Sequence, residues 1–322
     1  MDSLLAALRA CAEPTRLRVL ALATSGAFCV VELTEILGQS QPRLSRHLRL
    51  LCDAGVLERV REGSNVWFGL PPDIFGHGAL VHQLLAHIPQ DDPVLAADRR
   101  AAARVLAERA RIASETFRKQ GADWDEMRAL SLPAAEVESA LLSLLPPTGV
   151  SRVLDIGTGT GRMLELLAPH VRSGLGIDAS RAMLALARAR LAKPGLAHLS
   201  VRQADMYSLP LPQHFDLVLL HMVLHYAEDP CAALAEAARA LRPAGTLIVV
   251  DLEQHDRAVM IDRLAHRWPG FGNAEMASLL QAAGLEPDRI VTVDAPLPIR
   301  LWTATAPAAT QIQTAPHLEF AQ

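Results

Sequence analysis

The fold of the second half of the chain is decided by residues 153–162, which read Val153-Leu154-Asp155-Ile156-Gly157-Thr158-Gly159-Thr160-Gly161-Arg162. A hydrophobic strand that contains an acidic residue opens there into three alternating glycines and then a helix. Glycine suits such a turn because its backbone adopts unusual dihedral angles and leaves room where a Cβ would clash with a ligand. A dinucleotide fingerprint, G-x-G-x-x-G, would place its third glycine at position 162, which is Arg162. The observed G-x-G-x-G spacing therefore indicates a nucleotide-like ligand of another class.

Polar groups also follow the next apolar strands along the chain. The strands expected over residues 174–177, 199–204 and 215–220 end at Asp178, at Asp205 with Met206, and at His221. Asp178 lies about 20 residues beyond the glycines, where a carboxylate that binds a ribose is expected. Ligands of an open parallel sheet bind at the carboxyl ends of its strands, so we expect these positions to meet in one crevice. Further strands over residues 246–250, 289–293 and 298–303 complete a predicted seven-stranded α/β domain.

These motifs, in this order, resemble the class I methyltransferases that depend on S-adenosylmethionine (SAM), particularly the small-molecule branch related to quinone and sterol methylation. The resemblance covers roughly residues 117–303 and implies a Rossmann-like sheet with SAM as the cofactor. It implies further site residues: Asp155 in the first motif, Gly157, Gly159 and Gly161 under the methionine part of SAM, Asp178 on the ribose, and Asp205 with the Met206 backbone on the adenine. Trp124 is expected to cover the SAM pocket, although an aromatic residue at a helix junction is at least as often simple packing. The alternative for the whole domain is a structural α/β unit with incidental glycines.

Two histidines, His221 and His225, follow the fourth strand, where a methyl acceptor would reach the cofactor. Methyl transfer needs an aligned nucleophile and the exclusion of water, and it needs a base only when the acceptor must lose a proton. Either histidine is a candidate for that base. The alternative is that His221 lines the SAM pocket and that His225 is hydrogen-bonded in a loop. The sequence carries no acceptor-specific motif, so the expected acceptor is an unidentified small molecule.

The first 90 residues have a different pattern, which predicts a helix-turn-helix over residues 31–51 with Gly38 at the turn. In the second helix, which opens at Ser40, three leucines share one face. The residues turned away from that face, all candidates for DNA binding, are Gln41, Arg43, Ser45, Arg46 and Arg49. A hairpin expected over residues 58–70 forms a wing, with Arg59 and Arg61 before its turn.

This region resembles the winged helix-turn-helix of the ArsR family, whose recognition helix commonly reads S-Q-P-x-x-S-x-H-L, as it does here from Ser40. The whole chain resembles the bacterial group in which such a domain is fused to a methyltransferase. Operator double-stranded DNA is then the expected partner, read by a homodimer because one recognition helix covers only a half-site. The net charge is −4, but five arginines between residues 41 and 61 face only two acidic residues. A local basic stripe is enough for phosphate contacts, while the alternative is an amphipathic helix with a solvated basic face.

The cysteine pattern argues against a metal site. Thiolate sensors of the ArsR family use a Cys-x-Cys pair, but here Cys29 is followed by Val30 and Val31, and valine is no ligand. His77, His82 and His87 are five residues apart, a spacing that spreads them around a helix. We therefore expect no bound metal. With no paired cysteine spacing, signal peptide or long apolar span, the chain is expected to be cytoplasmic and to have no membrane partner.

Four segments are predicted: an ArsR-type DNA-binding domain at residues 1–90, a helical linker and cofactor lid at 91–146, a methyltransferase domain at 147–303 and a flexible tail at 304–322. A long helix over residues 94–119 is expected to bridge the domains. The expected function is a transcription regulator with an active SAM-dependent methyltransferase. Two alternatives are a regulator whose methyltransferase-like domain only senses SAM or S-adenosylhomocysteine, and an enzyme whose helix-turn-helix serves dimerisation. The arginines of the recognition helix and wing disfavour the last.

Overall fold

A computed structural model describes residues 1–62, 65–71, 77–89, 91–120, 133–147, 149–193, 195–211, 214–256 and 266–308. The expected lid residue Trp124 and most of the expected tail lie outside these residues.

The second half of the chain forms one sheet of seven strands in the order β6-β5-β4-β7-β8-β10-β9. The strands are β4 (Arg152–Ile156), β5 (Ser173–Asp178), β6 (Leu199–Gln203), β7 (Phe215–His221), β8 (Leu241–Leu252), β9 (Glu286–Val293) and β10 (Ile299–Thr305). The neighbouring pairs β6–β5, β5–β4, β4–β7 and β7–β8 are parallel. Strand β10 pairs antiparallel with β8 and with β9. The parallel strands therefore end at one common edge, and the predicted Rossmann-like class is confirmed.

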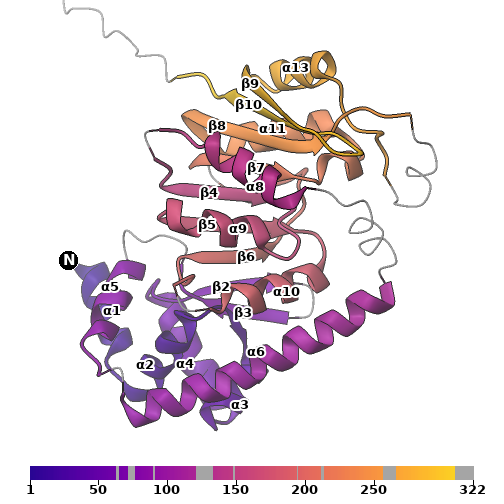
Figure 1. The fold of residues 1–322 in the computed structure, drawn as a ribbon. Helices are drawn as coiled ribbons and strands as arrows, with labels where there is room; N and C mark the ends of the chain where they lie inside the picture. Colours follow the sequence, from indigo (N-terminus) through magenta and orange to yellow (C-terminus); the bar gives the residue numbers. More distant parts are fainter. Residues whose placement is uncertain are drawn as a thin grey trace, which may run out of the picture.

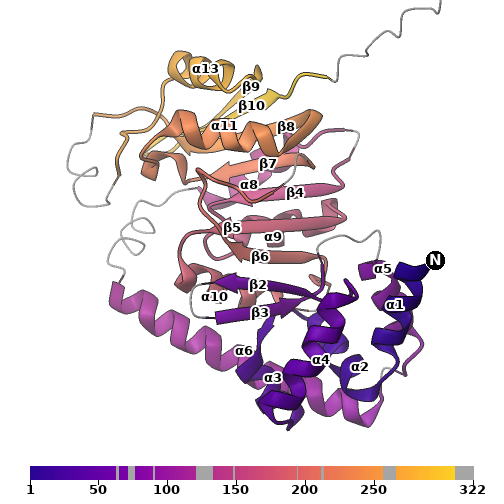
Figure 2. The ribbon, with the colours of Figure 1, turned by 180° about the vertical axis from the view of Figure 1, so that it is seen from behind.

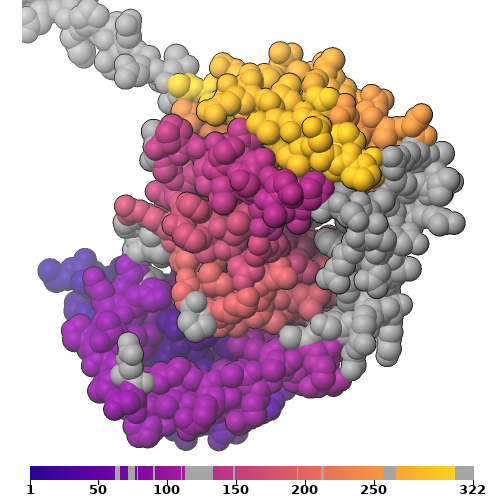
Figure 3. Space-filling model, viewed as in Figure 1, coloured from indigo at the N-terminus to yellow at the C-terminus, as the bar shows by residue number. Residues whose placement is uncertain are grey.

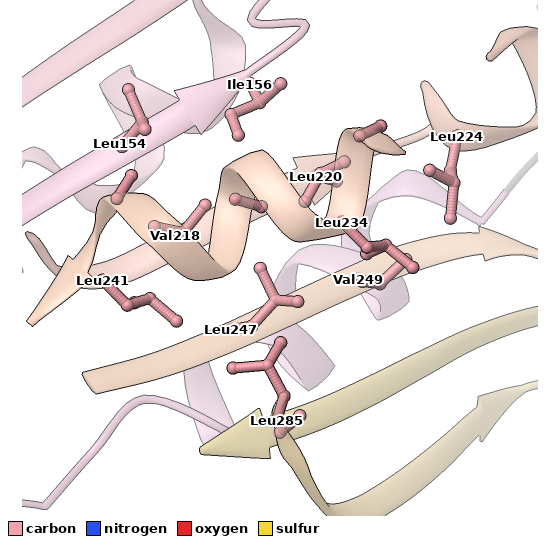
Figure 4. Packing of buried hydrophobic residues seen from close by; sticks show 14 of the residues in the cluster. Leu154, Ile156, Val218, Leu220, Leu224, Leu234, Leu241, Leu247, Val249 and Leu285 are labelled. Atoms are coloured by element: carbon pink, nitrogen blue, oxygen red, sulfur yellow. The ribbon is translucent and has the colours of Figure 1, made fainter. Parts of the chain in front are cut away.

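Helices cover both faces of the sheet (Figures 1 and 2). One face carries α8 (Ala134–Ser143), α9 (Arg162–Leu167) and α10 (Arg181–Leu191), and the other carries α11 (Pro230–Ala240) and α13 (Asn273–Ala282). Figure 4 shows Leu234 of α11 beside Val249 of β8, and both are buried in one apolar cluster with Val218 and Leu247. Full burial of such a side chain contributes about 1.5–3 kcal/mol, so this packing fixes the sheet that presents the strand ends.

Strand β8 differs from the sequence prediction because it begins at Leu241 rather than near residue 246. The segment 242–245, which precedes the expected strand, lies within β8 as an irregularity. Phe215 of β7 pairs with Leu241, and the register then shifts so that Leu217 pairs with Thr246. Ala244 has a φ of 58° at this point. These residues therefore interrupt the pairing of β8 with β7 without ending the strand.

The N-terminal part of the chain forms a winged helix-turn-helix. Its elements are α1 (Asp2–Cys11), α2 (Pro14–Ala23), β1 (Phe28–Cys29), α3 (Val30–Leu37), α4 (Gln41–Asp53), β2 (Glu58–Glu62), β3 (Asn65–Gly69) and α5 (His77–Ala86). Gly38 ends α3 in the left-handed conformation, with a φ of 63°. Leu44, Leu48 and Leu51 of α4 are buried in the core of this domain. The expected turn, second helix and wing are all confirmed.

The predicted bridging helix is α6 (Pro93–Gln120). It packs on α2 and α3 of the N-terminal domain and on α10 of the sheet domain. Figure 3 shows it in purple, running along the lower side of the sheet domain. Its start is anchored by Asp98, which is 4% exposed and pairs with Arg18 at 2.7 Å. Farther along, Arg109 pairs with Glu32 of α3 at 2.6 Å. These two partly buried ion pairs fix α6 to the N-terminal domain.

Candidate functional site

The turn after β4 is built on a buried carboxyl group. Asp155 is 1% exposed, and its Oδ2 accepts a hydrogen bond from Thr158 Oγ1 at 2.6 Å. Burial raises the pKa of Asp155 to about 7, and the Thr158 hydroxyl opposes that shift. The N–H groups of Gly157 and Thr158 both donate to the carbonyl of Ile177 on β5, at 2.9 Å each. The turn is therefore fastened to the neighbouring strand, with the Asp155 carboxyl beneath it.

Asp178 ends β5 and is hydrogen-bonded to the glycine turn. Its carboxylate accepts the N–H of Gly159 at 2.9 Å and the N–H of Ser180 at 2.7 Å. Burial raises the pKa of Asp178 above its ordinary value, while these two hydrogen bonds lower it. Ser180 also caps α10, since its hydroxyl accepts the N–H of Met183 at 3.4 Å. The structure thus brings together the expected ribose carboxylate and the turn, as the sequence predicts.

The three glycines of the turn have different surroundings. A Cβ on Gly157 would lie 2.4 Å from Val223 Cγ2, and one on Gly161 would lie 3.2 Å from Ala187 Cβ of α10. Gly157 and Gly161 thus allow close approach of neighbouring segments. At Gly159 the nearest atom to an added Cβ is the Gly157 carbonyl oxygen at 4.0 Å. Of these three positions, Gly159 is the one that faces open space.

The segment after β6 lies beside the end of β5, because the N–H of Ala204 donates to the Asp178 carbonyl at 3.3 Å. Asp205 is exposed, and its Oδ1 accepts the N–H of Tyr207 at 3.0 Å. Met206 is half-buried and packs against the same apolar cluster as Tyr207. The expected adenine residues therefore follow a segment that is hydrogen-bonded to the end of β5 at Asp178.

His221 is the last residue of β7 and is half-buried. Burial lowers the pKa of its imidazole to about 4, against the opposing charge of Asp251, so this side chain is neutral at pH 7. Met222 follows with a φ of 52°, and its N–H donates to the Val250 carbonyl at 2.8 Å. A non-glycine residue whose backbone has this left-handed conformation is locally strained. The strand therefore ends sharply with a neutral imidazole at its carboxyl end.

His225 occupies a different environment from His221. It is fully buried, and its Nδ1 lies 2.6 Å from Asp251 Oδ1. Asp251 Oδ2 accepts the backbone N–H groups of Leu224 and His225, at 3.0 and 3.2 Å. The His225 ring lies 4.3 Å from that of His266, whose pKa burial lowers to about 4. His225 is therefore hydrogen-bonded in the loop after β7, as in the alternative interpretation.

Asp251 is a site residue that the sequence analysis missed. It comes directly after the run Thr246–Val250 and near the end of β8. The rule that identified Asp178 and Asp205, a polar residue after a parallel strand, also applies to this fifth strand. Asp251 is fully buried and holds the loop that carries His225.

The candidate DNA surface lies on α4. Its exposed residues are Gln41, Arg43, Ser45, Arg46 and Arg49. Arg59 and Arg61 of β2 are exposed as well. Figure 2 shows α4 in the half of the molecule away from β9 and β10, and the wing strands β2 and β3 between α4 and β6. All seven positions are therefore accessible, as a nucleic-acid surface requires.

Burial favours the protonated thiol at Cys29 and Cys52. Burial raises the pKa of Cys29, and it raises that of Cys52 to about 11. A metal ligand or nucleophile must be a thiolate, so these environments favour inert side chains. Within the described ranges, no group of three or more His, Cys, Asp or Glu side chains is placed to hold a metal ion.

Two protein-family models match the chain. Residues 13–59 match the bacterial regulatory proteins of the ArsR family, and residues 154–249 match a methyltransferase domain. The chain joins an ArsR-type domain to a methyltransferase domain. No helix in the part of the chain that the structure describes is long and apolar enough to cross a membrane.

Curated relatives match the methyltransferase half. An uncharacterized methyltransferase of Bacillus subtilis is 33% identical over 101 residues, which are 31% of this chain and 40% of that protein. A trans-aconitate 2-methyltransferase of Methylobacterium nodulans is 34% identical over 178 residues, 53% of this chain and 64% of that protein. The match thus spans less than two thirds of either relative. The crystal structure of a SAM-dependent methyltransferase from Aquifex aeolicus is 23% identical with a TM-score of 0.47, covering 57% of this chain and 99% of that one.

Proposed function

We propose that this protein is a DNA-binding transcription regulator whose methyltransferase domain binds SAM and methylates a small molecule. The observation that carries the enzymatic half is the meeting of the ends of β4, β5 and β7 at one edge of the sheet, where a ligand crevice is expected. There, Asp178 and the glycine turn are joined by a hydrogen bond, and His221 stands on the adjoining strand. Ligands of open parallel sheets bind in such a crevice.

The residues of the crevice fit SAM in chemistry as well as in position. Gly159 faces open space where the methionine part would lie, and the Asp178 carboxylate accepts hydrogen bonds of the kind that ribose hydroxyls donate. Asp205 and Met206 border the adenine position. When bound, SAM supplies an electrophilic methyl group, so the protein's task is to align the acceptor and exclude water.

His221 is proposed as the base for an acceptor that must lose a proton. Its imidazole is neutral at pH 7 because burial lowers its pKa to about 4, so it has a free electron pair to accept a proton. A base with so low a pKa is weak, which fits an acceptor whose proton is itself acidic. His225 is proposed to position the loop after β7 through Asp251.

Calorimetric titration of the full chain with SAM tests the crevice. Asp178→Ala should weaken SAM binding by roughly 1.5–3 kcal/mol, the size of hydrogen bonds that involve a charged group. Asp288→Ala is the matched control, because this carboxylate is 58% exposed on β9, at the far edge of the sheet. Equal affinity for wild type and Asp178→Ala would move the SAM site out of this crevice.

The regulatory half of the proposal rests on the exposed polar face of α4 in a complete winged helix-turn-helix. A two-fold operator requires a dimer. On α1, Leu4, Leu5 and Leu8 are 49%, 40% and 38% exposed, and α1 reaches α5 through the Ser3 hydroxyl, 3.0 Å from His77 Nε2. Exposed leucines on one helix favour a partner surface. We assign the dimer interface to α1 and α5.

Sedimentation velocity tests that interface. Combined Leu4→Asp and Leu8→Asp substitutions place charges in the proposed contact and should convert a dimer to a monomer. Ile290→Asp is the matched control, since Ile290 is an equally exposed apolar residue on β9, at 49%. A dimer that survives the double substitution, or that is lost in the control, would contradict the assignment.

A further inference from the structure

The wing is attached to the sheet domain at two points. Trp67 of β3 lies against two guanidinium groups, that of Arg188 on α10, 4.2 Å from the ring centroid, and that of Arg109 on α6, 4.7 Å from it. Glu58 of β2 pairs with Arg202 of β6 at 2.7 Å. Figure 2 shows the reason, because β2 and β3 lie beside β6, the edge strand of the sheet. Two elements of the sheet domain, α10 and β6, therefore hold the wing.

The same two elements adjoin the expected nucleoside-binding residues. Helix α10 begins after Ser180, whose N–H donates to the Asp178 carboxylate at 2.7 Å and whose hydroxyl caps the helix. Arg188 follows Ser180 by eight residues, a rise of about 12 Å along the helix. Strand β6 ends at Gln203, two residues before Asp205. A ligand that contacts Asp178 and Asp205 therefore reaches the ends of both elements that hold the wing.

The attachment of the wing is loosely packed. A cavity of about 300 Å³ lies between the wing and the sheet domain, lined by Val60 and Trp67 on one side and by Leu196 and Val201 on the other. Side chains that face a void lose part of the dispersion energy that close packing supplies. The ion pair adds little, because the Glu58 side chain is 34% exposed. The free energy that holds the wing is therefore small, and a ligand that orders α10 and β6 can increase it.

The position of the wing affects the candidate DNA surface. Arg59 and Arg61, both exposed, are on β2 directly after Glu58. When β6 holds Glu58, the strand that presents these two arginines is fixed before DNA arrives. A binding surface that is ordered in advance loses less conformational entropy on binding. A firmly held wing should therefore bind an operator more tightly than a loosely held one.

We propose that a nucleoside ligand at Asp178 and Asp205 holds the wing against the sheet domain through α10 and β6, and thereby tightens operator binding. The inference rests on the proposed function, because it takes SAM and operator DNA as the two ligands. SAM and S-adenosylhomocysteine share the ribose and the adenine, so both should act alike. Linkage requires the operator to tighten SAM binding by the same factor.

Two titrations of the full chain measure this coupling. Fluorescence anisotropy gives the dissociation constant of a selected operator for the protein alone, with saturating SAM and with saturating S-adenosylhomocysteine. Both ligands should tighten operator binding at least about fivefold. Calorimetry should show that saturating operator tightens SAM binding by the same factor. Operator affinity that is equal in all three forms, or that only SAM changes, would overturn the proposal.

Charge reversal at the wing contact tests the route of the coupling. Arg202→Glu places a carboxylate opposite Glu58 and should reduce the coupling to less than about twofold, while the variant still binds each ligand alone. Adding Glu58→Arg restores opposite charges and should restore the coupling. The coupling is a ratio of affinities, so the charge added to the wing cancels from it. Coupling that survives Arg202→Glu, or that the double variant fails to restore, contradicts the route.

The matched control is Arg289→Glu. Arg289 is 60% exposed on β9, the other edge strand of the same sheet, and it pairs only loosely with Asp288, at 3.7 Å. Reversal of its charge changes the sheet domain by the same amount as Arg202→Glu but far from the wing. This variant should keep the coupling of wild type, and a loss of coupling in it as large as in Arg202→Glu would attribute the effect to charge alone.

Hydrogen exchange separates this inference from the proposed function, because it needs no DNA. Saturating SAM should slow amide exchange in β2 and β3 of wild type but not in those strands of Arg202→Glu. If SAM binds by calorimetry and exchange in the wing stays unchanged, the inference is wrong and the SAM site stands. If SAM does not bind, both are wrong. If no operator can be selected, the DNA half of the proposed function fails, whereas exchange still decides whether SAM holds the wing.

Discussion

The two domains hold their candidate functional residues in opposite ways. In the methyltransferase domain, Asp155 and Asp251 are buried and hydrogen-bonded, so the groups that shape the site also stabilise the fold. In the N-terminal domain, Arg43 and Arg46 are exposed on a helix whose other face forms the core. Substitutions in the crevice should therefore change stability together with binding, whereas substitutions on α4 should change binding alone.

The largest effect is expected at Asp251. Asp251→Ala removes the partner of His225 Nδ1 and the acceptor of two backbone N–H groups inside the core. Removal of one partner from a buried charged network costs about 3–5 kcal/mol. Urea unfolding should show a free energy of unfolding that is lower by this amount.

The matched control for that variant is Glu228→Ala. Glu228 pairs with Arg267 at 2.7 Å on the surface, where the two side chains are 69% and 56% exposed. Surface ion pairs contribute little, so this variant should unfold almost as wild type does. If Asp251→Ala lowers the free energy of unfolding no more than Glu228→Ala does, the contrast between buried and exposed sites is wrong.

A smaller effect, confined to binding, is expected on α4. Arg43→Ala and Arg46→Ala should each lower affinity for an operator selected from random duplexes by about tenfold, and a lost phosphate contact should reduce the salt slope by about 1. Fluorescence anisotropy measures both. Urea unfolding should be unchanged, because neither side chain is buried. Arg289→Ala on β9 is the control, and the same affinity in all three variants would exclude this helix from the groove.

The sequence predicted local features with periodic or spaced signals. The glycine spacing, the apolar strands and the leucines of α4 determined the sheet and the helix-turn-helix, because each pattern reflects burial on one face. The positions of Asp178 and His221 followed from the rule that strand ends meet. The reason for glycine at position 161 could not be predicted in this way. Gly161 packs against Ala187, and that contact depends on how α10 packs on the sheet.

Contacts between segments that are far apart in the chain could not be predicted from the sequence. His225 was predicted as a possible base, yet its burial depends on Asp251, 26 residues away, and on His266. The cavity between the wing and β6 likewise depends on the docking of two domains, which no local pattern describes. Asp251 itself could have been found, since it obeys the strand-end rule.

The last contrast lies in the pH dependence of stability, where Asp155 and His221 should act in opposite directions. Burial lowers the pKa of His221 from 6.5 to about 4, so between these values the unfolded chain binds the extra proton and stability falls as pH falls. Burial raises the pKa of Asp155 from 3.8 to about 7, so the folded chain holds the extra proton and stability falls as pH rises through that window.

Two variants separate these contributions. Relative to wild type, His221→Gln should gain stability as pH falls from 6.5 to 4, and Asp155→Asn should gain stability as pH rises from 3.8 to 7. Each gain is limited to about 1.4 kcal/mol per pH unit, because one proton is involved. Urea unfolding across the range measures both slopes. Arg43→Ala should run parallel to wild type throughout, and parallel curves for all four proteins would show that burial in the crevice does not control these two groups.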